Sequence, residues 1–168
     1  MRRDCLNLDK LYKMQSGLDQ HIEQKHGLAE EDLFDRKILA LLVELGELAN
    51  ETRCFKFWSV KPASDSKVIL EEFVDGIHFI LSVGIECGFE FKEEEMVEQA
   101  TAYSVSEQFL KVYGSINEFH SSKTRSVYTR MFRDYLDLAV MLGFTEKEIE
   151  QAYIQKNEVN YDRQLKGY

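Results

Sequence analysis

The sequence has very little proline and little glycine, since Pro62 is the only proline among 168 residues and there are nine glycines. Turn-rich β folds use both residues often, so their scarcity favours long helices. No apolar run approaches the roughly 20 residues that span a membrane. The N-terminal sequence MRRDCLNLDK also lacks the apolar core of a signal peptide. We therefore expect no membrane partner and a cytoplasmic location.

Cysteine and basic residues are also scarce. Cys5, Cys54 and Cys87 form an odd, widely spaced set that contains no zinc-type pair and is typical of free thiols in a reducing compartment. The 21 Lys and Arg residues are outnumbered by 30 Asp and Glu residues, which gives a formal net charge of −9. Such a balance argues against a nucleic-acid partner. It still allows a nucleotide ligand, because a bound metal ion can reverse the local charge.

Hydrophobic residues recur three and four apart through most of the chain, which is the spacing of amphipathic helices. The expected helices are residues 6–25, a helix capped by Asp32, residues 66–87, one or two helices within 91–119 with a break at Gly114, residues 122–142 and residues 145–168. Thr145 and Glu148 match a capping box at the start of the last helix. Residues 54–66, with the only Trp and the only Pro, are expected to form an ordered connection.

Two pairs of acidic residues stand on successive expected helices. Glu44 and Glu47 are three apart on one, and Glu72 and Asp75 are three apart on the next. Residues at this spacing are neighbours on a helix surface, so two facing helices would bring four carboxylates together. Like charges share a small volume only when protons or cations neutralise them, and oxygen ligands favour hard divalent ions such as Mg²⁺. A solvated acidic surface is the simpler alternative, which two pairs bordering apolar stripes disfavour.

The last expected helix carries a polar face suited to phosphate. Lys156, Asn160, Arg163 and Gln164 lie close together at helical spacing. An ammonium, an amide and a guanidinium can together bind phosphate oxygens. Basic residues in a last helical turn also complement the helix dipole without any ligand. The pattern alone therefore leaves both interpretations open.

A few further residues could contact a ligand. Trp58 and Phe79 could stack on a base or a sugar, and the Gln15 amide could donate to and accept from a pyrimidine edge. His78 could orient a carboxylate ligand through a hydrogen bond. Each of these residues, taken singly, is more often a structural side chain.

Three segments together resemble a known family. ELGELANE, EEFVDGIHF and AYIQKNEVNYDRQ, with a Trp-containing loop after the first, are similar to the dimeric, all-α deoxyuridine triphosphatases (dUTPases). These belong to the all-α nucleoside triphosphate pyrophosphatase superfamily, which includes MazG-like enzymes. The ExxE…ExxD pattern marks the superfamily, and the KNxxNxxRQ ending and Met14-Gln15 narrow the resemblance to the deoxyuridine branch. The chain departs from that branch at Asp19, where the family tends to carry Asn.

The resemblance implies a single all-α domain over residues 1–168, a multi-helix bundle with a four-helix metal-binding core on which helix 145–168 closes. It implies a homodimer that hydrolyses dUTP to dUMP and pyrophosphate, which limits uracil in DNA and supplies dUMP. A second candidate substrate is dUDP. The resemblance implies that two or three Mg²⁺ are bound by Glu44, Glu47, Glu72 and Asp75, and that Glu44 or Glu47 is also the catalytic base. It implies phosphate contacts from Lys156, Asn160 and Arg163. The implied base or sugar contacts are Gln15, Trp58, Phe79 and Asn157, with His78 and Gln164 as supporting residues.

Two other functions remain open at this point. One is a pyrophosphatase for dCTP or for a broader set of nucleotides. Uracil has a carbonyl at position 4 where cytosine has an amine, so the flip of one side-chain amide could change the preferred base. The other is a non-catalytic helical protein whose acidic faces bind a basic partner. The first predicts hydrolysis of other nucleotides, and the second predicts neither metal binding nor hydrolysis.

Overall fold

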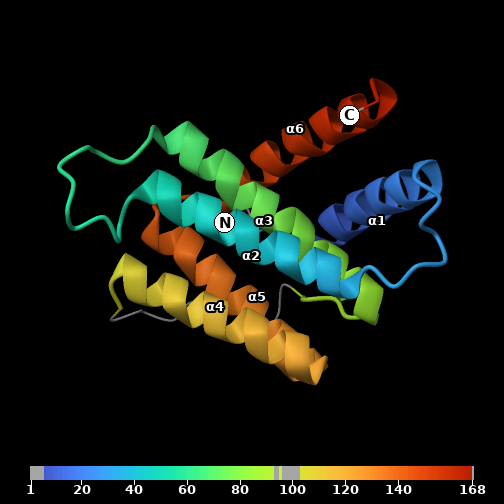
Figure 1. Cartoon of the computed structure of the whole chain (residues 1–168), viewed down its shortest axis with the longest axis horizontal. Coiled ribbons are helices and arrows are strands. Elements are labelled where there is room, and N and C mark those ends of the chain that lie inside the picture. The colour runs from blue at the N-terminus through green and yellow to red at the C-terminus, as the bar shows by residue number, and fades with distance from the viewer. Residues whose placement is uncertain (1–5, 93–94, 96–102, 168) are drawn as a thin grey trace, which may run out of the picture.

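The computed structural model describes residues 6–92, 95 and 103–167, and this part of the chain contains helices and no strand (Figure 1). The six helices are α1 (Leu8–Lys25), α2 (Phe34–Thr52), α3 (Ser66–Cys87), α4 (Val105–Ser122), α5 (Arg125–Met141) and α6 (Glu146–Leu165). The predicted all-α class is confirmed. None of the described helices is long and apolar enough to cross a membrane. Cys54 and Cys87 are free thiols, and Cys5 lies outside the described residues.

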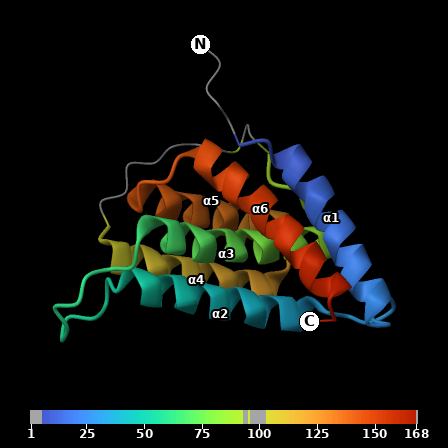
Figure 2. The ribbon, with the colours of Figure 1, turned by 90° about the horizontal axis from the view of Figure 1, so that it is seen from above.

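Four of the helices form a bundle on which the other two pack. Figure 2 shows α2, α3, α4 and α5 lying alongside one another, with α1 and α6 crossing them obliquely at one side. Within the bundle α2 contacts α3 and α4, and α5 contacts α3 and α4. Both α1 and α6 pack against α3 and against each other. The expected four-helix core is present, and α3 is the helix that joins it to α1 and α6.

The central helix α3 is buried on nearly every side. Its buried residues include Phe73, Val74, Ile77, Ile80 and Leu81, and a helix that is apolar all round is typically surrounded by other elements. Glu72 and Asp75 interrupt this apolar surface and are only partly exposed. Because burying a carboxylate without a partner is unfavourable, this acidic pair needs an explanation beyond packing.

Glycines in α3 allow two tyrosines of α5 to reach its backbone. The Tyr135 hydroxyl donates to the Phe73 carbonyl at 2.9 Å, and the Tyr128 hydroxyl donates to the Ile80 carbonyl at 3.0 Å. A Cβ at Gly76 would overlap the Tyr135 ring, and no such neighbour surrounds Gly114 of α4. The α3–α5 packing therefore depends on the absence of a side chain at Gly76.

We expect Gly76→Ala to lower the free energy of unfolding by about 1–3 kcal/mol, the usual cost of overpacking a core. Gly114→Ala is the matched control, because the added methyl has open space and removes the conformational freedom that glycine has in the unfolded chain. Urea unfolding of both variants measures the difference. Equal stability of the two would contradict the assigned packing.

Most helix boundaries agree with the sequence to within three residues, as for α5, which begins at Arg125 where the prediction gave 122, and two differences have a physical reason. The Thr145–Glu148 capping box is formed at the start of α6, and Gly88 follows α3 with a φ of 71°. The predicted break at Gly114 is wrong, since α4 continues to Ser122. Burial of the flanking α4 side chains outweighs the roughly 1 kcal/mol that a helical glycine costs relative to alanine. Residues 93–94 and 96–102 of the expected 91–119 region lie outside the described residues.

The start of α2 is the second difference. Leu33 is the N-cap residue, one position after the predicted Asp32. The Asp32 carboxylate still accepts a hydrogen bond from the Phe34 N–H at 3.0 Å. Asp32 therefore satisfies a donor at this helix end from just outside the helix.

Candidate functional site

Three acidic side chains converge where α2 packs on α3. One carboxylate oxygen from each of Glu44, Glu72 and Asp75 lies within 4.8 Å of the others. Glu44 comes from α2, whereas Glu72 and Asp75 come from adjacent turns of α3. Each of the three is partly buried. We call these three residues the acidic triad.

Glu47, the fourth predicted ligand, lies at the rim of the triad. It is exposed on α2, and its carboxylate is not among the oxygens that meet within 4.8 Å. Its charge nevertheless raises the pKa of Glu44, Glu72 and Asp75. Glu47 is therefore electrostatically part of the cluster and sterically at its edge.

The carboxyl groups of the triad resist ionisation in the free protein. Burial, followed by the charges of Asp75, Glu47 and Glu72, raises the pKa of Glu44 to about 7. Burial and neighbouring carboxylates also raise the pKa of Glu72, and burial raises that of Asp75. A site that concentrates negative charge and offers only oxygen donors fits a hard divalent cation.

The raised pKa of Glu44 predicts how stability depends on pH without metal. The folded protein holds a proton that the unfolded chain releases near the ordinary Glu pKa of 4.5. Stability should therefore fall as the pH rises from about 4.5 to 7. Thermal unfolding in a chelating buffer at several pH values measures this, and Glu44→Gln should show a weaker dependence. Identical pH profiles for the two proteins would contradict the shift.

Helix α6 places cations against the triad. The Lys156 ammonium donates to Asp75 Oδ2 at 2.7 Å, and the Arg163 charge lowers the pKa of Asp75. Asn160 lies between them on α6 and is partly buried. A cavity of about 360 Å³ between α3 and α6 is lined by Lys156, Arg163 and Lys67. The structure thus brings the predicted phosphate contacts next to the predicted metal ligands.

A second group of predicted residues meets between α1, α3 and α6. Gln15 and His78 are only 4% and 5% exposed, and Gln15 Oε1 lies 2.7 Å from His78 Nδ1. The Tyr153 hydroxyl donates to the same oxygen at 2.7 Å, and Asn157, one turn further along α6, is buried as well. Among the described residues, His78 Nε2 and Asn157 Nδ2 are buried without a hydrogen-bond partner. Two such unpaired polar atoms in one region point to a ligand.

This geometry changes the expectation for His78. The predicted hydrogen bond from His78 to a carboxylate ligand is not found. The His78 side chain faces α1 and α6, where its Nδ1 meets Gln15. Its ring instead stacks on Tyr153 with centroids 4.2 Å apart. Tyr153 was not identified from the sequence. Its position three residues before Lys156 was the one available signal.

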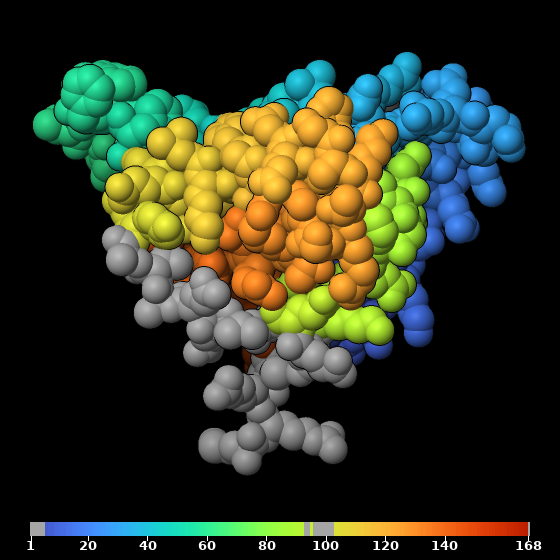
Figure 3. Space-filling view, turned by 90° about the horizontal axis from the view of Figure 1, so that it is seen from below, coloured from blue at the N-terminus to red at the C-terminus, as the bar shows by residue number. Residues whose placement is uncertain are grey.

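Three other predicted residues make none of the contacts described so far. Trp58 is 64% exposed in the loop between α2 and α3, where it contacts the Phe57 ring at 5.1 Å. This loop lies at the opposite end of the molecule from α1 and projects from its body (Figures 1 and 3). Gln164 is hydrogen-bonded to His26 at 2.9 Å. Phe79 is partly buried and packs against the core.

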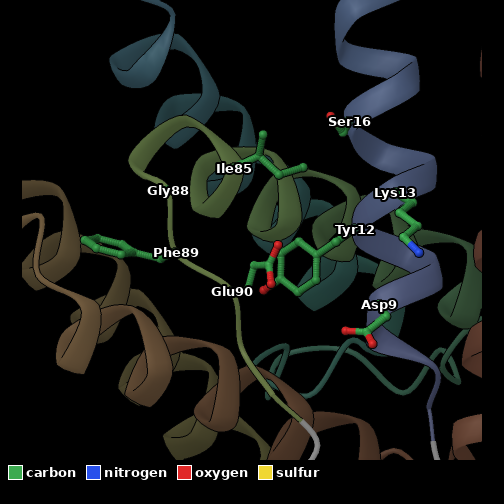
Figure 4. A pocket seen from close by; sticks show the side chains of 8 residues that line it. All are labelled: Asp9, Tyr12, Lys13, Ser16, Ile85, Gly88, Phe89 and Glu90. Atoms are coloured by element: carbon green, nitrogen blue, oxygen red, sulfur yellow. The ribbon is translucent and has the colours of Figure 1, made fainter.

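A larger cavity of about 410 Å³ lies beside the C-terminal end of α3 (Figure 4). Asp9, Lys13 and Glu90 contribute its charged groups. The Tyr12 hydroxyl in its wall is already bonded to the Tyr128 hydroxyl and to the Phe91 N–H. Its buried hydroxyl is satisfied, and its carboxylates are not among those that converge on one point, so the triad is the stronger candidate.

Comparison with known proteins identifies a family for this chain. A protein-family model described as dUTPase matches residues 7–168. No curated protein matches the chain. The matched residues include all six described helices and every member of the triad.

Proposed function

This chain belongs to the dUTPase family over nearly its whole length, and we propose that it hydrolyses dUTP to dUMP and pyrophosphate with Mg²⁺ as cofactor. The observation that carries the proposal is the meeting of Glu44, Glu72 and Asp75 opposite the Lys156 ammonium. Anionic side chains that bind metal, beside cationic side chains that bind phosphate, are what a metal–triphosphate complex requires.

The acidic triad, with Glu47 at its rim, would hold two or three Mg²⁺. When bound, these ions would neutralise charge on the phosphates and make a water more acidic. The carboxylates hold their charge in this state because the cations replace the protons that burial otherwise favours. Their partial burial also limits competition from bulk water.

We assign the removal of a proton from the attacking water to Glu44 rather than to Glu47. A general base must lie within hydrogen-bond reach of the water whose proton it removes, and bound cations would hold that water at the centre of the cluster. Glu44 is partly buried at the centre of the cluster, whereas Glu47 is exposed at its edge. Glu47 then contributes charge and a rim ligand.

Helix α6 supplies groups that stabilise charge on the phosphates. Lys156 provides a point charge and Arg163 a planar pair of donors, and the Asn160 amide can hydrogen-bond between them. The Lys156 ammonium, which bonds Asp75 in the free protein, is within reach of a phosphate bound at the triad. We therefore infer that α6 closes on the triphosphate through these residues.

The region between α1, α3 and α6 is assigned to the nucleoside. The unpaired His78 Nε2 and Asn157 Nδ2 offer polar contacts to a pyrimidine, and Gln15 supports them from behind. Phe79, partly exposed on α3 beside His78, packs on the deoxyribose and leaves no room for a 2′-hydroxyl. Base and sugar selectivity would then arise on the helix that also carries Glu72 and Asp75.

A pyrophosphate-release assay across dUTP, dCTP, the other deoxynucleoside triphosphates and UTP tests the proposal, with release of phosphate measured for dUDP. We expect Mg²⁺-dependent release of pyrophosphate from dUTP, with UTP a much poorer substrate. Faster turnover of dCTP would transfer the assignment to a dCTP pyrophosphatase. Absence of hydrolysis with every nucleotide would favour a binding protein and overturn the proposal.

We also propose that the chain acts as a homodimer. The loop between α2 and α3 is confined to one end of the molecule, and it exposes Phe57 at 93% and Val60 at 105% of their side-chain reference areas. Apolar groups that project this far usually meet a partner. Because Trp58 lies at the opposite end from Gln15, its predicted base contact would require a second copy. Light scattering of the purified protein measures the oligomeric state.

A further inference from the structure

A continuous chain of polar side chains runs from the surface to the buried His78. The Lys37 ammonium lies 4.0 Å from Asp19 Oδ2, and the Ser82 hydroxyl donates to the same oxygen at 2.7 Å. The other oxygen, Oδ1, accepts from Gln15 Nε2 at 2.7 Å. Gln15 Oε1 then meets His78 Nδ1 at 2.7 Å. The hydrogen bonds therefore join α1 and α3 in one network that ends at the nucleoside region, and Lys37 of α2 lies beside it as an ion-pair partner of Asp19.

The Asp19 carboxylate determines which groups of this network donate hydrogen bonds and which accept them. An ionised carboxylate only accepts hydrogen bonds, so the atom of Gln15 that faces it must be the amide nitrogen. The Ser82 hydrogen bond and the Lys37 charge both favour the ionised form of Asp19 against the effect of burial, which raises its pKa. The Gln15 amide therefore has a single satisfied orientation.

The orientation of Gln15 in turn determines which nitrogen of His78 carries the proton. Gln15 Oε1 is an acceptor, so Tyr153 O–H and His78 Nδ1–H both donate to it. The imidazole is neutral, because burial and the Lys156 charge lower the pKa of His78 to about 3. A neutral ring with a proton on Nδ1 has a lone pair on Nε2, and Nε2 is the ring atom that lacks a partner among the described residues.

We propose that Asp19 is a positioning residue for nucleotide recognition: its carboxylate fixes the Gln15 amide and thereby holds His78 with Nε2 as a hydrogen-bond acceptor. A pyrimidine then meets an acceptor at this point, which suits a ring N–H or an amine. The inference rests on the proposed function for the role of Nε2 towards substrate. The hydrogen-bonded network itself is a property of the free protein.

Asp19 differs in this respect from the Asn that the resembling family tends to carry. An Asn amide can both donate and accept, so it can satisfy either orientation of Gln15. A carboxylate cannot. In this chain the direction of the network is therefore determined by Asp19, and removing its acceptor should free Gln15 to rotate.

The test is the tautomer of His78, measured by ¹⁵N NMR of the imidazole nitrogens in the free protein. We expect the Nδ1–H form in the unaltered protein and a shift towards the Nε2–H form in Asp19→Leu, with Asp19→Ala as the substitute if the leucine variant does not fold. Ser82→Ala is the control, because it leaves the carboxylate in place and should keep the Nδ1–H form. An Nε2–H ring in the unaltered protein, or an unchanged ring in the Asp19 variants, overturns the inference.

Kinetics separates the positioning role from a merely structural one. Losing one well-directed hydrogen bond should raise KM for dUTP about tenfold in the Asp19 variant and leave kcat within about twofold. A loss of kcat with unchanged KM would contradict positioning of the base. The expected tautomers in a protein that hydrolyses no dUTP would overturn the proposed function and leave the network assignment intact.

Discussion

Glu44→Gln is expected to reduce dUTP hydrolysis at least ~100-fold, because losing even a residue that supports a metal ligand commonly costs about 10–100-fold. The substitution removes one oxygen charge from the triad and, by our assignment, the proton acceptor. Thermal stability without metal should remain the same or increase, because the Gln amide ends the repulsion that raises the pKa of Glu44. A large loss of activity without a loss of stability is the result expected if Glu44 serves metal binding and catalysis and does not stabilise the fold.

Steady-state kinetics with saturating Mg²⁺ and thermal unfolding in a chelating buffer measure these two effects. Glu30→Gln makes the same change of charge at an exposed position outside the helices, and it should alter neither. A Glu44→Gln protein that kept most of its activity would remove Glu44 from the site. A protein that lost activity and stability together would indicate a structural role for this carboxylate.

Lys156→Met is expected to have opposite effects on metal and on nucleotide. The ammonium bonds Asp75 Oδ2 at 2.7 Å and therefore competes with a cation for that oxygen, so the variant should bind Mg²⁺ alone more tightly. The same change removes a charged contact to phosphate, worth roughly 1.5–3 kcal/mol. We therefore expect kcat/KM for dUTP to fall about 10–100-fold.

Calorimetric titration with Mg²⁺ alone and kinetics with dUTP separate the two effects. Lys67→Met is the matched control, because Lys67 lines the same cavity from α3 and is not assigned a contact with phosphate. It should change kcat/KM little. Weaker binding of both Mg²⁺ and nucleotide by the Lys156 variant would show that the ion pair only maintains the packing of α6.

The sequence predicted the helical elements well wherever a single periodicity governed them. The α3 residues from Phe73 to Leu81 carry dense apolar side chains ahead of Gly88, so both the helix and its burial were evident. Gly114 misled the prediction because local propensity is weak compared with tertiary packing. The core contacts that stabilise α4 come from other helices, so the sequence around Gly114 does not reveal them.

The acidic triad was predictable for a similar reason. Spacing of three on each of two consecutive helices brings carboxylates to one face, and consecutive antiparallel helices commonly pack together. The rim position of Glu47 depends on the rotation of α2 about its axis, which spacing does not determine. Helical spacing alone thus identifies the pairs without separating central from peripheral ligands.

The polar network around Gln15 could not be predicted from the chain. Its hydrogen bonds join residues 63 and 138 positions apart, and they form because α1 and α6 both cross α3. Sequence reasoning identified Gln15 and His78 singly, and it assigned His78 to the wrong kind of partner. Tyr153, which joins them, carried no distinguishing pattern.

The central claim is that carboxylates from α2 and α3 form a binding site for divalent cations. Crystals grown with Mn²⁺ in place of Mg²⁺ and a slowly hydrolysed dUTP analogue test this through anomalous scattering. The account predicts strong peaks within coordination distance of Glu44, Glu72 and Asp75, with the analogue's phosphates on the side of Lys156. Analogue bound elsewhere, or a triad without any anomalous peak beside it, would contradict the account.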